Sequence, residues 1–292
     1  DTLLREAFAG FSALGVLSTE PCAPFSEPAG TTLGEGAAFF VLERAKDAER
    51  RGARAWGSVR GYGLSAAAFH ETPPDPSGSG VARAIRCAPL DAGWSARDVD
   101  YVSAHATGTE NNDRVEWSVL ARELGAPLVS GSKGHLGHTQ GAAGALELVL
   151  ALLAHREGCV PPTLHFRGPR AGCPSDPVAS STPRVAPVAR GLKLSAAFGG
   201  ANAVLAYERE PSPARPRARA HVTVGGVGVV GPLGAHRLGD VLELAHARSA
   251  GERREIDLDA LGVDGRRLDR TARALTGAAA LALPHARRSS PE

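Results

Sequence analysis

The hydrophobic and polar positions of the 292-residue chain form short apolar runs that alternate with longer charged or amphipathic stretches. The short runs, rich in β-branched and aromatic residues, predict strands over residues 37–43, 55–65, 99–105, 127–133, 191–197 and 201–208. The longer stretches predict helices over residues 1–11, 44–54, 77–93 and 111–125. Strands that alternate with helices favour an α/β layered domain with a largely parallel sheet.

Local signals refine three of these elements. The unbroken apolar run AAFFVLE at 37–43 is typical of a buried strand. Pro89 is expected to end or kink the helix in which it lies. Asp113 and Glu116 have the spacing of a capping box, and Gly125 marks the end of that helix.

Residues 141–155, GAAGALELVLALLAH, predict a helix of a different kind. Its apolar residues point to nearly every side, so the helix is expected to be buried on all faces. Glu147 lies inside it, and a buried carboxylate is costly unless an opposite charge pairs with it. Lys133 on the preceding loop is the expected partner, either as a structural ion pair or with a direct chemical role.

His105 ends one predicted strand, and His138 follows the next strand and its loop. The residues between them have about the size of a βαβ unit, whose right-handed crossover places both strand ends at one sheet edge. Ligands of open α/β sheets bind at that edge. Two neutral imidazoles that converge there would donate two N–H groups to one oxygen and stabilise enolate charge on a thioester carbonyl.

Three motifs, in their order and spacing, resemble the β-ketoacyl synthases of fatty-acid and polyketide assembly. They are HATGT at 105–109 followed by Asn112, Asp113 and Glu116, SKGHLGHTQGAAGALE at 132–147, and AAFGGANA at 196–203. The resemblance extends over residues 1–210 and implies the thiolase-like layered αβαβα fold.

The resemblance implies roles for the residues that match its motifs. His105 and His138 resemble the two catalytic histidines, which assist decarboxylation of a malonyl unit and stabilise charge on the thioester oxygen. Lys133 resembles the lysine that organises the histidine loop, and Glu147 resembles its helix carboxylate.

Three further residues resemble substrate-binding positions of the family. Thr107 and Thr109 match the hydroxyls that hold the phosphopantetheine arm of an acyl carrier protein, and Phe198 matches a gating phenylalanine. The resemblance therefore implies an acyl carrier protein as partner, with its phosphopantetheine thioester as the carried substrate. It also implies no bound cofactor, and a homodimer or heterodimer of ketosynthase units.

The chain departs from the family pattern in two ways. Alanines stand at 106, 196, 197 and 201, where glycine, a phenylalanine–glycine pair and threonine are common, and alanine stiffens the gate loop relative to glycine. No cysteine has the small-residue setting of the family's nucleophile, without which no acyl-enzyme forms. The cysteines, interpreted as structural or incidental, are Cys22, Cys87, Cys159 and Cys173. We therefore expect a fragment that lacks its N-terminal nucleophile half.

The expected function is that of a β-ketoacyl-[acyl-carrier-protein] synthase segment, an acyltransferase for decarboxylative Claisen condensation of acyl and malonyl thioesters. The alternative is a non-catalytic ketosynthase-like partner of the chain-length-factor type. Two convergent histidines favour the enzyme, because a purely structural subunit has no need of them. The thiolase branch of the fold is disfavoured, because its motifs place a cysteine in the C-terminal portion and no cysteine of this chain fits that position.

The composition changes near residue 211, which predicts a domain boundary. Residues 1–210 form the ketosynthase C-terminal half, PSPARPRAR at 211–219 is a Pro/Arg linker, and residues 220–292 resemble the start of a second ketosynthase-like domain. GVGVVG at 226–231 matches the GxGxxG fingerprint, but a poor helix follows it, so a strand is favoured over nicotinamide binding.

Composition and spacing argue against several other classes. A net charge of +2 gives no footprint for nucleic acid, and no apolar run reaches the ~18 residues of a membrane span. The absence of a CxxC pair fits a reducing cytosol, so a cytoplasmic protein is expected. His135 and His138 lack a third ligand at a zinc spacing, so no metal is expected. Surface or loop positions are expected for His155, His165, His221 and His236.

Overall fold

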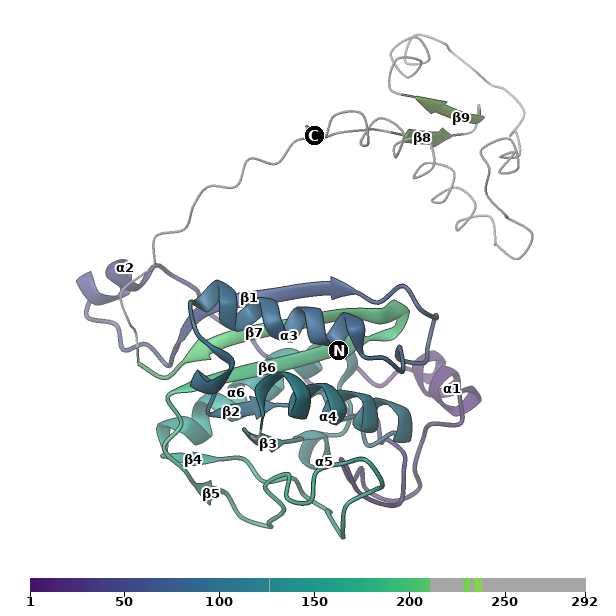
Figure 1. Ribbon diagram of the computed structural model, residues 1–292, viewed down its shortest axis with the longest axis horizontal. Coiled ribbons are helices and arrows are strands. Elements are labelled where there is room, and N and C mark those ends of the chain that lie inside the picture. The colour runs from purple at the N-terminus through teal and green to yellow at the C-terminus, as the bar shows by residue number, and fades with distance from the viewer. Residues whose placement is uncertain (126, 211–227, 232–233, 238–292) are drawn as a thin grey trace. The chain divides into compact units, whose positions relative to one another are not determined.

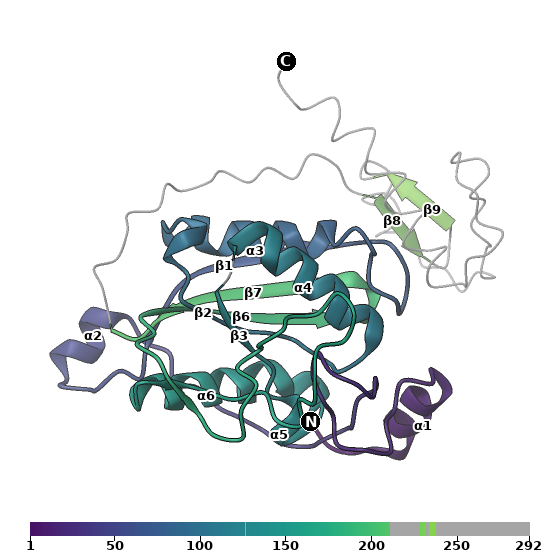
Figure 2. The same cartoon turned by 60° about the horizontal axis from the view of Figure 1, so that its bottom comes forward.

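The computed structural model of the protein describes residues 1–125, 127–210, 228–231 and 234–237 (Figure 1). The chain divides into two compact units, Asp1–Arg215 and Pro216–Glu292, and each is considered by itself. In the first unit, helices lie on both faces of a five-stranded sheet (Figure 2).

The sheet has the strand order β1, β7, β6, β2, β3. In that order the strands are Ser58–Ala66, Ala201–Glu208, Arg190–Ala197, Tyr101–Ser103 and Leu128–Ser130. β6, β2 and β3 pair in parallel, whereas β7 pairs antiparallel with both β1 and β6. β1 therefore runs in the same direction as β6, and β7 alone is reversed in this sheet. The sheet is mixed: its β6, β2 and β3 part is parallel, as expected from the sequence, and its β1 and β7 part is antiparallel.

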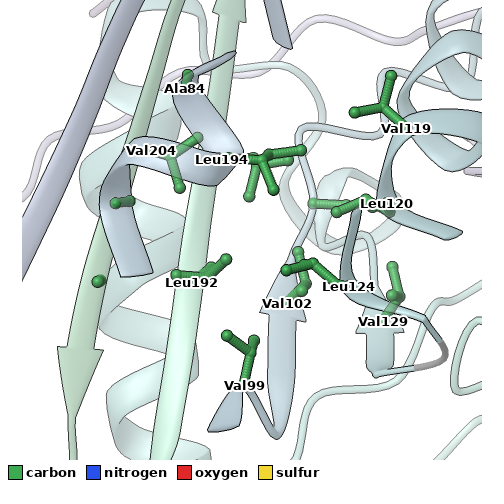
Figure 3. Packing of buried hydrophobic residues seen from close by; sticks show 14 of the residues in the cluster. Ala84, Val99, Val102, Val119, Leu120, Leu124, Val129, Leu192, Leu194 and Val204 are labelled. Carbon is green, nitrogen blue, oxygen red and sulfur yellow. The ribbon is translucent and has the colours of Figure 1, made fainter. Parts of the chain in front are cut away.

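Two helices cover one face of the sheet and a third covers the other (Figures 1 and 2). α3 (Ser79–Ala92) and α4 (Glu110–Leu124) lie on the first face, and α6 (Ala143–Arg156) lies on the second. The larger hydrophobic core is formed between the sheet and the first pair of helices (Figure 3). A smaller core lies on the α6 side.

The strand β6 contributes to both sides of the sheet. Leu192 and Leu194 belong to the larger core, together with Val102 and Val129 of the neighbouring strands (Figure 3). Because side chains alternate along a strand, Lys193 points to the opposite face, toward α6. One polar residue of β6 is thereby directed at the helix that carries Glu147.

Two glycines allow α3 to lie directly against β1. A Cβ atom on Gly63 would sit 2.0 Å from the carbonyl oxygen of Ala84, and one on Gly61 would sit 2.5 Å from the nitrogen of Ala92. A larger residue at either position would push the helix off the strand. The glycine-broken strand predicted at 55–65 is thus confirmed, and its glycines permit close approach of the helix.

The remaining described elements are short. The helical ones are α1 (Arg5–Ala13), α2 (Ala45–Arg50), α5 (Lys133–Leu136) and the 3-10 turns Ala96–Asp98, Gln140–Ala142 and Phe198–Gly200. Two short strands pair with each other, β4 (Cys159–Val160) and β5 (Arg184–Val185). None of the described helices is long and apolar enough to cross a membrane.

In the second unit, the structure describes an antiparallel pair, β8 (Gly228–Gly231) and β9 (Gly234–Arg237). β8 covers the last four residues of GVGVVG, and the next described element is a strand. The preference for a strand over a dinucleotide-binding helix start is thus confirmed. The linker 211–219, His221 and the rest of the predicted second domain lie outside the described residues.

The prediction of a buried strand at 37–43 is wrong. The segment belongs to no strand, and Phe39 and Val41 are 95% and 89% exposed. A strand needs a hydrogen-bonded neighbour, and none of the strands in the described ranges pairs with this segment. The apolar composition of residues 37–43 was therefore not enough to make this segment a strand.

The helix α6 is not buried on all faces, as its composition had predicted. Its buried side is the stripe Ala143, Glu147, Ala151 and His155, whereas Leu153 is 44% exposed. His155 was expected at the surface, but this stripe holds it inside. These four residues are spaced four apart, so they share one side of the helix. The buried side is thus made of small and polar residues, and the large apolar residues lie elsewhere on the helix.

Pro89 does not end α3, contrary to one of the two expectations. The helix continues to Ala92 and ends at Gly93, whose φ of 78° is left-handed. Pro89 lies in the last turn, so its missing N–H removes only one hydrogen bond near the end of the helix.

Candidate active site

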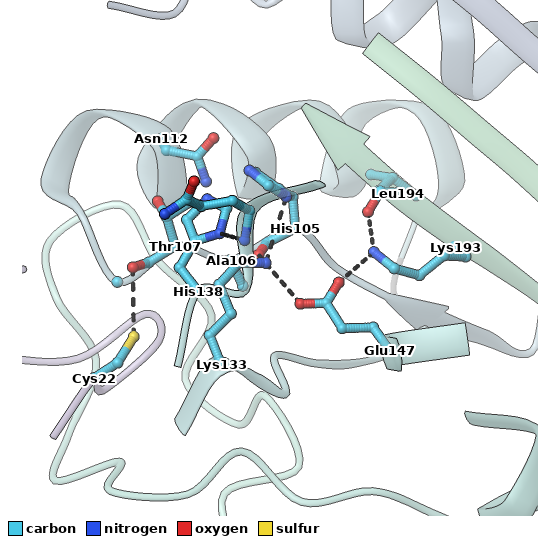
Figure 4. Close-up of polar contacts among 12 residues, drawn as sticks. Cys22, His105, Ala106, Thr107, Asn112, Lys133, His138, Glu147, Lys193 and Leu194 are labelled. Carbon is cyan, nitrogen blue, oxygen red and sulfur yellow. Dashed lines mark hydrogen bonds and ion pairs between the residues drawn. The ribbon is translucent and has the colours of Figure 1, made fainter. Parts of the chain in front are cut away.

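His105 and His138 lie side by side at the carboxyl ends of β2 and β3 (Figure 4). Their ring centroids are 5.4 Å apart and their planes are inclined by 84°. β2 and β3 are parallel strands with α4 between them in the chain, which is the βαβ unit predicted from the sequence. The two rings therefore meet as the topology predicted, whereas their chemical roles stay predictions.

Glu147 holds two buried ammonium groups, one on each carboxylate oxygen (Figure 4). Lys133 Nζ lies 2.7 Å from Oε1, and Lys193 Nζ lies 2.7 Å from Oε2. All three residues are at most 3% exposed. The structure contains the expected Lys133–Glu147 pair and adds Lys193, which the sequence analysis did not place in the site.

Hydrogen bonds select the same tautomer in both imidazoles. Lys133 donates to the backbone carbonyl of His105, and its Nζ lies 3.4 Å from Nδ1 of the same residue. Since an ammonium group has no acceptor, Nδ1 accepts and the ring proton lies on Nε2. In His138, Nδ1 accepts from the backbone N–H of Gln140 at 3.1 Å. Each ring therefore retains an Nε2–H group as a donor.

Both imidazoles are neutral near pH 7. Burial, Lys133 and the neighbouring His138 hold the pKa of His105 well below its ordinary value. Burial and Lys133 lower the pKa of His138 to about 3, with Glu147 opposing and Lys193 assisting this shift. Burial alone would raise the pKa of Glu147, but the two lysines lower it, so it is a carboxylate. The site thus presents two uncharged donors beside a buried ion cluster.

The capping box predicted for Asp113 and Glu116 is wrong. α4 begins at Glu110, with Thr109 as its N-cap, so both carboxylates lie inside the helix and are buried. They accept backbone N–H groups of other segments at 2.6–3.1 Å, and these donors are His105, Ala106, Phe25 and Gly108. Glu116 therefore holds the backbone at His105 in place.

Hydroxyl and aromatic side chains border the two imidazoles. The Thr107 and Thr109 hydroxyls lie 2.8 Å apart on the loop after β2. Phe198, at the turn between β6 and β7, is 52% exposed, and its ring lies 5.6 Å from that of Phe11 in α1. The Phe11 ring in turn lies 6.0 Å from the ring of His138. The predicted gate residue is thus connected to the histidine pair through Phe11.

Two cysteine thiols lie in surroundings that keep them protonated. Cys22 is 1% exposed, and its thiol donates to the carbonyl oxygen of Thr107 at 3.4 Å. Burial and the nearby Asp113 raise the pKa of Cys22, and that of Cys173, to about 11. Protonated thiols are poor nucleophiles, which agrees with a structural interpretation. In the described ranges, no three His, Cys, Asp or Glu side chains are grouped so that they could hold a metal ion.

Lys193 and Phe11 are residues of the site that sequence reasoning missed. Lys193 is one of only three lysines among 33 basic residues, a scarcity that drew attention to Lys133 alone. Phe11 lies in a helical segment without a motif. Its proximity to His138 depends on a contact between segments distant in the sequence.

Family models match the chain over most of its first unit. The model of the β-ketoacyl synthase C-terminal domain matches residues 56–167, and the model of the N-terminal domain matches residues 2–48. The chain belongs to the β-ketoacyl synthase family.

This β-ketoacyl synthase chain has relatives among curated proteins. It is 41% identical over 204 residues to nodulation protein E of Rhizobium meliloti, which covers 68% of this chain and 50% of that protein. It is 36% identical over 213 residues to 3-oxoacyl-[acyl-carrier-protein] synthase 2 of Staphylococcus aureus (strain COL), covering 70% and 51%. The chain spans about half the length of the curated relatives it matches.

Solved ketosynthase structures share the fold. The ishigamide ketosynthase/chain length factor has a TM-score of 0.69 and 39% identity, covering 72% of this chain and 52% of that one. A β-ketoacyl synthase from Burkholderia phymatum STM815 has the same TM-score and 32% identity, covering 72% and 53%. The expected thiolase-like α/β fold is thus confirmed for this β-ketoacyl synthase chain.

Proposed function

We propose that this chain is the decarboxylating segment of a β-ketoacyl-[acyl-carrier-protein] synthase, an acyltransferase that condenses acyl and malonyl thioesters in fatty-acid or polyketide biosynthesis. The observation that carries the proposal is the pair of buried, neutral imidazoles whose rings lie 5.4 Å apart. Hydrogen bonds to both Nδ1 atoms leave each ring with an Nε2–H donor. The similarity to 3-oxoacyl-[acyl-carrier-protein] synthase 2 supports the same reaction.

In the proposed reaction, His105 and His138 donate their Nε2–H groups to the carbonyl oxygen of a malonyl thioester. The bond to the free carboxylate breaks, carbon dioxide leaves, and the electron pair forms an enolate whose charge rests on that oxygen. The enolate carbon attacks the carbonyl carbon of an acyl thioester, and the sulfur leaves as a thiolate as the new C–C bond forms. Lys133 and Glu147 keep the His105 ring in place.

We infer that the acyl group is carried by a thiolate other than the four cysteines of this chain. Burial raises the thiol pKa of Cys22 and Cys173 to about 11, and burial also raises that of Cys159. Cys87 lies on α3, on the face of the sheet opposite α6. An acyl-enzyme requires an activated thiolate, which none of these settings favours.

An acyl carrier protein is the proposed partner. Thr107 and Thr109 would hold its phosphopantetheine arm, and Phe198 would gate access, with no cofactor bound by the synthase itself. One similar structure, with 30% identity, is an acyl carrier protein of a type II polyketide synthase in complex with its ketosynthase. A cytoplasmic dimer of ketosynthase units fits the similar structures that contain a chain length factor.

A chain-length-factor type partner without catalysis is the second candidate, because two similar structures contain such a subunit. The residue that faces the histidine pair from the rest of the complete protein discriminates the two. A cysteine there supports condensation, whereas glutamine or another inert residue supports the partner role. Under either proposal, residues 1–210 form the ketosynthase C-terminal half, followed by the linker 211–219 and the start of a second ketosynthase-like domain at 220–292.

The test is malonyl decarboxylation by the complete protein that contains this chain. We expect His138→Ala to lower kcat by about 10²–10³-fold, the usual loss when an oxyanion donor is removed. His165→Ala, which alters an exposed histidine, is the matched control and should leave the rate unchanged. Near-normal turnover of His138→Ala would contradict the proposed role.

A further inference from the structure

Lys193 is a buried cation for which the proposed reaction has no step. It lies in the middle of β6 and is 3% exposed. Its Nζ lies 2.7 Å from Oε2 of Glu147 and also donates to the carbonyl oxygen of Leu194 (Figure 4). The side chain is almost completely shielded from water, so hydration does not offset the cost of burying its charge.

The folding of the site does not by itself require a second ammonium group. Lys133 already neutralises Glu147 through Oε1 at 2.7 Å, and an isolated pair of this kind has no net charge. A second cation adds a desolvation penalty that a neutral side chain of similar length would avoid. Burial lowers the pKa of Lys193, whereas the negative charges of Glu147 and of Glu116 in α4 favour its charged form.

Resting on the proposed function, we propose that Lys193 is a positioning residue of the condensation site. Its ammonium group binds Glu147 Oε2, which fixes the carboxylate that aligns Lys133 with His105, and it places a second positive charge beside both imidazoles. Lys193 thereby adds to the burial and to the charge of Lys133 in favouring the neutral form of His105 and His138, in which Nδ1 accepts and Nε2–H donates.

The charges around the two rings come from four elements and support this role. They are Glu116 of α4, Lys133 of α5, Glu147 of α6 and Lys193 of β6. Burial contributes most to the low pKa values of both histidines, and the charges of Lys133 and Lys193 lower these values further. Without Lys193, the negative charge of Glu147 would favour protonation of His138 with less opposition from positive charge.

The first test needs no substitution. With only three lysines in the chain, selective ¹⁵N-lysine labelling gives three side-chain signals to assign. We expect the Lys193 signal at pH 7 to be that of an ammonium group protected from exchange with water. A neutral amine at pH 7 would overturn the proposal, because the charge beside the imidazoles would be absent.

The second test follows imidazole protonation by NMR in the full chain. Lys193→Met removes the charge and retains most of the length of the side chain. We expect protonation of His138 to begin at a pH higher by on the order of one unit than in the unmodified chain. Lys46→Met, at an exposed position of α2, is the matched control and should not move it. An unchanged onset in folded Lys193→Met contradicts the proposal.

Neither readout depends on turnover, so the inference and the proposed function can fail separately. Absence of decarboxylation in the complete wild-type protein would contradict the function and leave the charge of Lys193 measurable. If Lys193→Met does not fold, the protonation state of Lys193 in the unmodified chain still decides whether the charge exists. In an active enzyme, the acid limb of the kcat/KM profile of Lys193→Met is expected to move to higher pH with the imidazole onset.

Discussion

His155 is a buried histidine outside the proposed site, and its surroundings disfavour its protonated form. Its ring lies 5.1 Å from that of Tyr101 and 5.6 Å from that of Tyr207, and it is 2% exposed. Among the described residues, neither ring nitrogen has a hydrogen-bond partner. Burial, with Arg209 adding to it, lowers its pKa to about 4.

We predict that this imidazole makes folding stability depend on pH. In the unfolded chain its pKa is about 6.5, so between pH 6.5 and 4 the unfolded state binds the proton and the folded state does not. Stability is therefore lost as pH falls, by about 2 kcal/mol from pH 8 to pH 5 for His155 alone. Urea denaturation at both pH values should show a smaller loss for His155→Phe than for the unmodified chain.

The exposed His165 provides the control for that measurement. His165→Phe should retain the full loss of stability, because His165 lies at the surface and the buried His155 is unchanged in this variant. His105 and His138 act in the same direction, but both are present in every variant, so the difference isolates His155. An equal loss in His155→Phe and the unmodified chain would disprove the assignment.

At the scale of residues, the sequence predicted contacts within the βαβ unit and missed those made across it. His105 and His138 could be paired because the handedness of the crossover determines where both strands end. Lys193 could not, because its contact with Glu147 depends on β6 lying beside β2, a pairing between distant segments. Glu116 was misinterpreted because its partners are backbone groups of a loop, which carry no side-chain signal.

Among the elements, the packing of β1 against α3 depends on glycine. A Cβ atom on Gly63 would meet the carbonyl oxygen of Ala84 at 2.0 Å, closer than real atoms approach. We predict that Gly63→Ala lowers the free energy of unfolding by about 1–3 kcal/mol, since the helix must shift to admit the methyl group. Chemical denaturation measures this directly.

Gly10 in α1 provides the opposite case. A Cβ atom there would meet no atom within 4 Å, so Gly10→Ala should be neutral or stabilising, by up to about 1 kcal/mol. A loss of stability as large as that expected for Gly63→Ala would contradict the assignment of the Gly63 effect to the close contact between β1 and α3, because Gly10 has no such contact. The sequence predicted the strand, but the reason for its glycines required the position of α3.

On the scale of the whole molecule, apolar side chains remain on the surface of the first unit. Phe39, Val41 and Leu42 are 95%, 89% and 79% exposed. The sequence predicted burial here because residues 37–42 are all apolar. A strand is formed by its neighbours, however, and the described ranges provide none for this segment. Hydrophobicity predicts that a segment will be covered and says nothing of which surface covers it.

We predict that the chain produced by itself associates through this segment. Contiguous exposed apolar side chains favour association in water. The double variant Phe39→Ser/Leu42→Ser should scatter less light at equal concentration, with its free energy of unfolding changed by less than about 0.5 kcal/mol. Leu90→Ser, at a 74% exposed position of α3, is the control outside the segment. Equal scattering by the double variant and the unmodified chain would contradict the prediction.

The two faces of β6 have a consequence for how this protein can change over time. Leu192 and Leu194 lie in the larger hydrophobic core, while Lys193 between them pairs with the carboxylate of Glu147. Inserting or deleting a single residue inside β6, ahead of this triplet, would exchange the two sets and place an ammonium group among leucines and a leucine against Glu147. Related sequences that preserve the charge cluster can therefore differ in the length of the irregular stretch before β6. Inside the strand, they must keep the spacing or change it by two residues.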